Sequence, residues 1–147
     1  MAEKMFDLEE AERLLPQVEL WLRSAIEAKE EIEKIDLDYV SLVRQVASSG
    51  GRQIDIGHAI RQKAEKEERL ARFGMAVQEI ENSGCLLKDL DIGLVDFPCE
   101  IDGREVYLCW KLDEPSIAFW HHPEDGFAGR KPIDATFLQQ HKRSRPN

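Results

Sequence analysis

Apolar residues recur at steps of three and four along the first half of the chain, which is the spacing of one face of an α-helix. A first stripe, within residues 16–47, consists of Val18, Leu22, Ala25, Lys29, Ile32, Ile35, Tyr39, Leu42 and Val46. A second stripe, within residues 56–82, consists of Ile60, Lys63, Leu70, Phe73, Val77 and Ile80. The Ser-Ser-Gly-Gly sequence at 48–51 supplies a turn, and Gly84 supplies a helix stop. The pattern predicts a long antiparallel helical hairpin over residues 1–83.

The start of this hairpin carries two further signals. Asp7 and Glu10 have the spacing of a capping box, so a helix is expected to begin at about Leu8. Pro16 lacks an amide donor and disfavours helical geometry at the residue before it. We therefore expect a short first helix that is broken or kinked at Pro16, with a fresh helix following it.

The second half of the chain reads as strands. Residues 93–101 and 104–110 are separated by Asp102-Gly103, a strong signal for a two-residue hairpin turn. This turn sets the register, and the expected pairs are Ile101–Arg104, Glu100–Glu105, Cys99–Val106, Pro98–Tyr107, Phe97–Leu108, Asp96–Cys109 and Val95–Trp110. One face of the hairpin is then apolar and the other is mixed, as expected for a sheet with one packed face.

A third strand is expected at residues 117–121, after a turn at residues 113–116. Pairing Leu112 with Ile117 would place Phe119 beside Trp110, with His121 near Leu108 on the packed face. The predicted fold class is α+β, in which a long antiparallel helical hairpin with a short kinked N-terminal helix precedes a small antiparallel β-meander packed on it.

Length and charge limit the function. The 147 residues include 29 acidic and 20 basic side chains, for a net charge of −9. Such a surface repels nucleic-acid phosphates and anionic lipids, so neither nucleic acid nor membrane is an expected partner. We expect a single domain over residues 1–140, with the sheet and a Gly-rich loop at 84–134, and a disordered basic tail at 141–147. With neither an apolar span nor a signal peptide, the expected location is the cytoplasm.

Two residue groups have simple structural interpretations. Cys85, Cys99 and Cys109 are odd in number and lack C-x-x-C spacing, so buried free thiols are expected rather than a disulfide framework. The charge-rich run at residues 63–69 is expected to be a solvated helix face with pairs such as Glu65 and Arg69.

Separated motifs give the chain a resemblance to a known family. They are FDLEEAERLLP at 6–16, KDLDIGLVDFP at 88–98, DGRE at 102–105, CW at 109–110, and WH at 120–121 followed by GFAGRKP at 126–132. In these motifs, and over nearly the whole chain to about Asp134, the sequence resembles the prokaryotic family named domain of unknown function 2203. The resemblance implies an intracellular domain and no particular activity.

Ionisable residues near aromatic side chains suggest a divalent metal site. Asp96, Glu114 and His121 are the candidate ligands, because carboxylates and imidazole suit hard or borderline ions. His121 and His122 are adjacent on a predicted strand, so their side chains point to opposite faces and only one is expected to bind. The alternative is a partly buried histidine that is hydrogen-bonded to a carboxylate of a helix.

A small-molecule site is a second possibility at the sheet, with candidates Asp91, Asp96, Trp110, Trp120 and Arg130. The glycines on either side of Phe127 and Ala128 could form, with Arg130, a nest for a carboxylate or phosphate. The alternative is a loop held by a salt bridge from Arg130 to Asp91 or Asp96.

Covalent and acid–base chemistry have weaker support. Cys109 faces Asp96 in the predicted register, with His122 nearby, but a neighbouring carboxylate disfavours the thiolate. Asp89 and Asp91 have the spacing of paired carboxylates for acid–base work, yet a turn before Gly93 explains them more simply. Whether the protein is an enzyme therefore stays open.

Two functions from different classes follow from these patterns. The first is an interaction or assembly module that associates through its helical hairpin as a homodimer, because residues 16–47 would form a helix about 48 Å long at about 1.5 Å per residue. A helix of that length with a narrow apolar stripe is typical of a coiled-coil seam. The second is a metal- or small-anion-binding domain, enzymatic or not, with a site around Asp96, His121 and Arg130.

Overall fold

The computed structural model describes residues 2–50 and 55–144 and confirms the α+β class. The elements in chain order are α1 (Leu8–Ser48), α2 (Ile56–Asn82), β1 (Leu86–Asp89), β2 (Leu94–Ile101), β3 (Arg104–Lys111), β4 (Phe119–His121), the 3₁₀-helix η1 (Phe127–Gly129), β5 (Lys131–Pro132) and α3 (Ala135–Ser144). In the described ranges, no helix combines the length and apolar character needed to cross a membrane.

The chain divides into two compact units. The sheet unit comprises residues 1–22 and 78–147, and the hairpin unit comprises residues 23–77. The start of α1 and the end of α2 thus belong with the sheet, whereas the sequence placed the division between hairpin and sheet at residue 84. The single domain expected over residues 1–140 remains a prediction.

The helix start at Leu8 is confirmed. The Glu10 amide donates to Asp7 Oδ1 at 2.7 Å and the Asp7 amide donates to Glu10 Oε1 at 3.4 Å, which is the reciprocal pattern of a capping box. The break expected at Pro16 is wrong, because α1 is one helix with Pro16 inside it. Buried Ala11, Leu15, Val18 and Leu22 continue one helical face past the proline, and their packing outweighs the cost of the missing amide.

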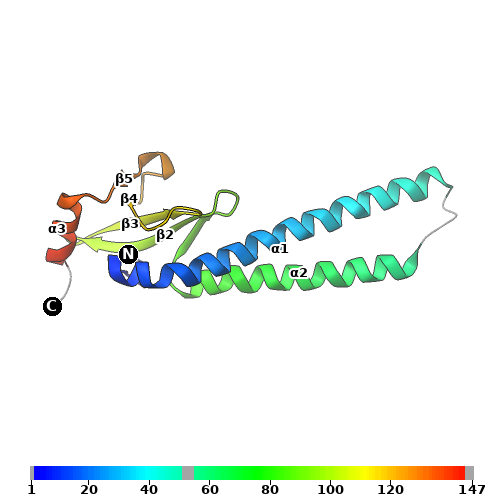
Figure 1. The fold of residues 1–147 in the computed structure, drawn as a ribbon, viewed down its shortest axis with the longest axis horizontal. Helices are drawn as coiled ribbons and strands as arrows, with labels where there is room; N and C mark the ends of the chain where they lie inside the picture. The colour runs from blue at the N-terminus through cyan, green and yellow to red at the C-terminus, as the bar shows by residue number, and fades with distance from the viewer. Residues whose placement is uncertain (1, 51–54, 145–147) are drawn as a thin grey trace. The chain divides into compact units, whose positions relative to one another are not determined.

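Within the hairpin unit, α1 and α2 lie side by side (Figure 1). Small side chains are buried near one end of the unit: Ala25, Ala28 and Ala76. Towards the α1–α2 connection the contacts become ionic, with Lys66 Nζ 2.7 Å from Asp36 Oδ1 and Arg69 bonded to Glu31. We call residues 31–48 and 56–72 the distal hairpin.

The apolar stripe predicted for α2 does not face α1 along its whole length. Ile60 and Leu70 are 64% and 48% exposed, whereas Gln62 is buried. Arg69 accordingly bonds Glu31 across the hairpin and contacts Glu68, rather than forming the predicted pair with Glu65. The predicted stripe is therefore wrong in this part of α2. The side of the helix that meets α1 carries Gln62, Lys66 and Arg69 instead.

The sheet has the strand order β1-β2-β3-β4-β5, and every neighbouring pair is antiparallel. The predicted β2–β3 register is confirmed at every pair from Ile101–Arg104 to Val95–Trp110. Asp102 and Gly103 both have positive φ, of 50° and 78°, as a two-residue hairpin turn requires. Phe97, Cys99, Leu108 and Trp110 are all fully buried on the predicted apolar face.

The register predicted for the third strand is wrong by one residue. His121 pairs with Tyr107, Trp120 with Leu108 and Phe119 with Cys109. The chain turns earlier than expected, because the Glu114 amide bonds the Lys111 carbonyl at 3.0 Å and the Leu112 amide bonds the Gly93 carbonyl at 2.9 Å. The slip moves His121 from the packed face to the mixed face of the sheet.

The disordered tail expected from residue 141 is also wrong as far as residue 144. These residues belong to α3, whose His141 is buried and stacks on Phe137. The Leu8 amide donates to His141 Nε2 at 3.0 Å, so α3 is bonded to the first turn of α1. The remainder of the predicted tail, and Gly51 of the predicted turn, lie outside the described residues.

Candidate functional site

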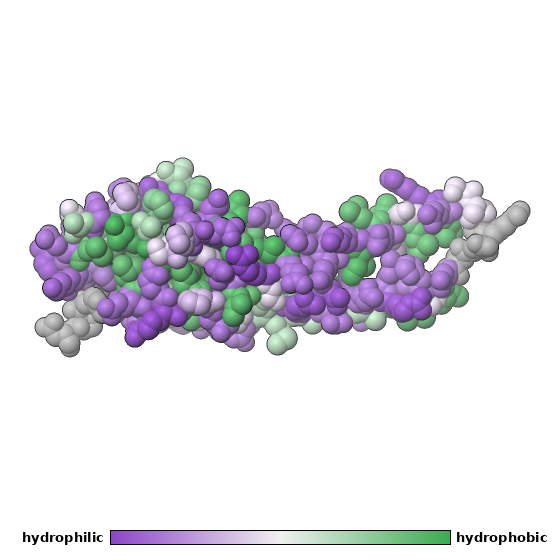
Figure 2. All heavy atoms as spheres, viewed as in Figure 1, coloured by the Kyte–Doolittle hydropathy of each residue, from purple (hydrophilic) through white to green (hydrophobic). Residues whose placement is uncertain are grey.

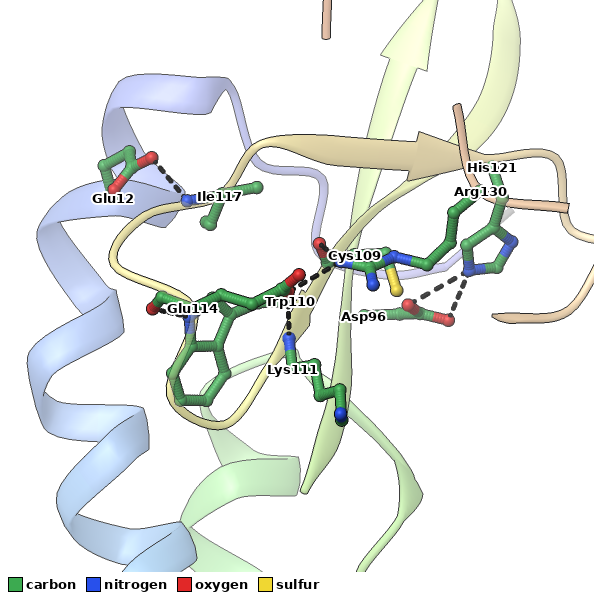
Figure 3. A network of polar contacts seen from close by, with 9 residues as sticks. All are labelled: Glu12, Asp96, Cys109, Trp110, Lys111, Glu114, Ile117, His121 and Arg130. Carbon is green, nitrogen blue, oxygen red and sulfur yellow. Dashed lines mark hydrogen bonds and ion pairs between the residues drawn. The ribbon is translucent and has the colours of Figure 1, made fainter. Parts of the chain in front are cut away.

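Three neighbouring strands each supply one side chain to a buried group on the mixed face of the sheet. Asp96 of β2 pairs directly with Cys109 of β3, and His121 of β4 reaches the same place (Figure 3). One potential ligand atom from each residue lies within 4.8 Å of the other two. All three residues are buried. We call this group the Asp-Cys-His cluster.

The hydrogen bonds of His121 define where its protons lie. Its Nδ1 is 2.7 Å from the His122 carbonyl oxygen, which can only accept, so Nδ1 carries a hydrogen. Its Nε2 is 3.1 and 3.0 Å from the two oxygens of Asp96. A bare Nε2 lone pair facing a carboxylate would be repelled. This contact therefore needs either a proton between Nε2 and Asp96, carried by the ring or by the carboxyl group, or a metal ion that both residues bind.

Cys109 lies in an environment that keeps its thiol protonated. Burial, together with the neighbouring Asp96, raises the pKa of Cys109 to about 12, while Arg130 has the opposite effect. A thiol with such a pKa is a poor nucleophile at neutral pH, as the predicted pairing with Asp96 suggested. The predicted neighbour His122 is replaced by His121, because of the register slip.

Arg130 joins Cys109 to the loop that follows β3. Its Nη2 is 2.6 Å from Glu114 Oε1 and 3.4 Å from the Cys109 carbonyl oxygen. Its guanidinium carbon lies 4.1 Å from the centre of the Phe119 ring. The salt bridge expected from Arg130 to Asp91 or Asp96 is therefore formed with Glu114 instead.

Glu114, a predicted metal ligand, is accordingly placed with Arg130 rather than with Asp96 and His121. Its Oε1 also accepts a hydrogen bond from the Lys111 amide at 2.7 Å.

The anion nest predicted around residues 126–130 gains no support from the backbone. In a nest, a residue with positive φ alternates with a right-handed residue. Neither Gly126 nor Gly129 has a positive φ.

The remaining candidate residues are dispersed. Asp91 is exposed in the turn before β2, where Asp89 Oδ1 accepts the Asp91 amide at 2.9 Å, so the simpler turn interpretation of these aspartates holds. Trp110 is fully buried on the packed face and donates from Nε1 to the Glu114 carbonyl at 2.9 Å. Trp120 packs against Phe137 of α3 at 5.1 Å between ring centres.

Cys109 was not among the predicted metal ligands, although the predicted register already placed it opposite Asp96. The signal that identifies it is this pairing combined with the type of side chain, because a thiolate is a strong ligand for borderline ions. A zinc ion lies about 2.0–2.3 Å from its ligand atoms, so ligand atoms around one ion are at most about 4.6 Å apart. The Asp-Cys-His cluster is close to that size.

The fold and the cluster define an α+β protein whose antiparallel sheet carries a buried aspartate, cysteine and histidine. A family model described as an uncharacterized conserved protein, DUF2203, matches residues 4–133. The chain therefore belongs to the DUF2203 family, as its motifs indicated. The match includes all three residues of the cluster and ends before α3. No curated protein and no solved structure matches the chain.

Proposed function

We propose that this protein binds one divalent metal ion of the zinc type, with Asp96, Cys109 and His121 as its ligands. The observation that carries the proposal is the geometry of His121. Its Nδ1 donates to a backbone carbonyl while its Nε2 faces both carboxylate oxygens of Asp96. Donation of the second ring nitrogen to a carbonyl is the usual arrangement of a metal-bound histidine, because it fixes the tautomer and orients the ring.

The type of metal follows from the donor set. One thiolate, one imidazole and one carboxylate favour a borderline ion such as zinc over calcium or magnesium, which prefer oxygen ligands alone. Three protein ligands leave a coordination position for a further group, as in zinc sites that act on a bound water or substrate. Arg130 donates to the Cys109 carbonyl and to Glu114, so it connects the strand that carries Cys109 to the loop that follows it.

Metal binding by this cluster must release protons. The Cys109 thiol keeps its proton at neutral pH, since burial and Asp96 raise its pKa to about 12. A bound ion replaces that proton, and it also replaces any second proton on His121. Zinc affinity is therefore expected to rise about tenfold for each proton released per unit of pH.

The test is metal analysis of the purified protein followed by titration of the metal-free protein with Zn²⁺ and Co²⁺. We expect one ion per chain and a thiolate-to-cobalt charge-transfer band in the near ultraviolet. Cys109→Ser should abolish that band. Cys99→Ser is the matched control, because Cys99 is an equally buried thiol on the opposite face of the neighbouring strand.

The outcomes separate clearly. Binding of less than one ion per chain at millimolar Zn²⁺, or a cobalt band that survives Cys109→Ser, would overturn the proposal. In that case His121 and Asp96 form a buried imidazolium–carboxylate pair with a structural role.

A second candidate function, self-association through the helical hairpin, rests on a separate observation. Several apolar side chains in the distal hairpin are exposed; Leu37, for example, is 70% exposed. Burying such side chains against another molecule is favourable by about 25 cal/mol per Å² of apolar surface. Light scattering between about 1 and 200 µM, a range that covers weak dimers, tests whether a dimer forms.

A further inference from the structure

Ion pairs join the two helices of the distal hairpin. Lys66 pairs with Asp36 at 2.7 Å, and Arg69 and Arg72 both reach Glu31 from the facing helix. These are partly exposed ion pairs, each of which contributes little to stability. The apolar side chains of the distal hairpin are at most half-buried, so its two helices share no fully buried apolar core.

Gln62 is the one buried polar residue of α2 in the described ranges, and its hydrogen bonding is incomplete. Its side-chain oxygen Oε1 has no hydrogen-bond partner among the described residues. Gln62 lines a cavity of about 300 Å³ together with Ile35, Tyr39, Ala59 and Lys63. A buried amide oxygen without a donor is costly, so a molecule that fills this cavity and supplies an N–H or O–H group would be stabilised there.

Apolar side chains are exposed on the outside of the distal hairpin, and one of them, Tyr39, also lines the cavity. Figure 2 shows apolar surface on the hairpin towards the α1–α2 connection. The apolar residues exposed there are Leu37, Tyr39, Val40, Val43, Ile56 and Ile60. An apolar face of this kind on the outside of a hairpin matches a hairpin that is covered by further helices.

Charge indicates which helices cover it. Residues 27–38 of α1 contain six acidic and two basic side chains, whereas residues 61–72 of α2 contain five basic and three acidic ones. The two helices of one hairpin are therefore complementary to the two helices of another copy placed antiparallel to it. A two-fold arrangement uses the same surface on both copies, which self-complementary charge favours.

We infer that the distal hairpin is an interface for a second copy of this chain, in which α1 of each copy lies against α2 of the other. In this four-helix arrangement Gln62 Oε1 receives a hydrogen bond from the partner copy and fixes the register. This inference rests on the self-association proposed above and names its surface. It is independent of the metal site.

The first experiment measures sedimentation of the full chain and of Ile60→Glu over a range of concentrations. Ile60 is exposed, so the substitution leaves the fold of the single chain intact, which circular dichroism verifies. A charge placed in the interface should weaken the dimer at least tenfold, an effect of about 1.4 kcal/mol or more. Leu138→Glu is the matched control, because Leu138 is an exposed apolar residue of α3.

The outcomes distinguish the surface from self-association itself. A chain that stays monomeric at 200 µM, a concentration roughly sufficient to populate even weak dimers, overturns both self-association and the proposed surface. The apolar face would then be a binding surface for a different protein. A dimer that Ile60→Glu does not weaken overturns the proposed surface alone. A dimer weakened equally by Leu138→Glu places the contact elsewhere and also overturns it.

Gln62→Leu tests the role of the buried amide. In the Ile60→Glu background, which is monomeric, the substitution removes an unpartnered acceptor and should raise the melting temperature. In the dimer it removes a hydrogen bond from the partner and should weaken association about fivefold. An unchanged dimer affinity in Gln62→Leu would overturn the register role.

Discussion

In the sheet unit many apolar side chains are fully buried, as at Phe97 and Trp110, whereas no apolar side chain of the distal hairpin is fully buried and partly exposed ion pairs join its helices. Asp96 and His121, both buried in the sheet unit, pair with each other, whereas the buried Nε of Arg130 has no partner among the described residues. Gln62 of the hairpin lacks a partner for its side-chain oxygen among the described residues. The sheet unit therefore has a buried apolar core of its own, and the distal hairpin does not.

The two functions proposed above, metal binding and self-association, fall in these two different regions. A buried, fully paired cluster offers a fixed geometry, which is what metal binding requires. An exposed apolar face beside weak ion pairs offers a surface for association. The difference in packing is tested by measuring how much matched substitutions in the two regions lower the free energy of unfolding. The measurements are made at low protein concentration, so that association does not contribute.

The largest difference is expected for truncation of a large apolar side chain. Trp110→Ala should lower the free energy of unfolding by about 3–5 kcal/mol, because Trp110 is fully buried and donates to the Glu114 carbonyl. Leu37→Ala, at an exposed site in the distal hairpin, should cost less than about 0.5 kcal/mol. Urea unfolding followed by circular dichroism measures both values. Similar costs for the two variants would remove the contrast between the units.

Loss of an acidic partner should cost less but show the same contrast. Asp96→Asn leaves His121 facing a neutral amide in a buried site, and in metal-free protein this should cost about 2–3 kcal/mol. Asp36→Asn breaks the exposed pair with Lys66 and should cost at most about 1 kcal/mol. Urea unfolding with a chelator present checks both. An equal loss in the two variants would mean that the buried pair is no more important than a surface ion pair.

Local chemistry explains which parts of the sheet could be predicted. Asp102-Gly103 sets the β2–β3 register by itself, since both residues adopt the positive φ that the turn needs. The connection to β4 is longer, and its course depends on distant contacts such as the Ile117 amide bonded to Glu12 of α1 at 2.9 Å. Such contacts are invisible to a pattern of apolar residues, so the register of His121 was missed by one residue.

The candidate site was therefore predicted in part. Asp96 and His121 were expected as ligands and the structure brings them together, but the predicted strand register did not place them on one face. Glu114 was expected beside them because it is near in sequence, yet Arg130 binds it. In α2, the predicted apolar stripe includes the exposed Ile60 and Leu70, whereas Lys66 bonds α1 from another side of the helix.

A methyl group added to glycine offers a finer comparison. Gly93 has a φ of 70°, and a Cβ there would lie 2.6 Å from Leu112 Cβ, in the loop that sets the register of β4. Gly93→Ala should cost about 2 kcal/mol, from backbone strain and displacement of Leu112. Gly50 has a similar φ of 73° but nothing within 4 Å, so Gly50→Ala should cost about 1 kcal/mol from strain alone. Thermal unfolding of both variants measures the difference, and equal costs would indicate that Leu112 yields freely.

The smallest effect at neutral pH comes from the thiols, all three of which lie in the sheet unit. Burial raises the pKa of Cys85 to about 11 and that of Cys99 to about 12, so the folded state favours the protonated thiol. An unfolded thiol ionises above about pH 8.5–9, and the stability contributed by each thiol is therefore present below that pH and lost as the pH rises towards 12. At pH 10 the loss should be about 1 kcal/mol per thiol.

The measurement is urea unfolding of wild type and Cys99→Ala at pH 8 and pH 10 with a reductant present. The variant should lose less stability between the two pH values than wild type, because lysines and tyrosines titrate equally in both. An identical loss in the two proteins would mean that Cys99 is accessible to water in solution, and the sheet unit would then be less tightly packed than the comparison with the hairpin requires.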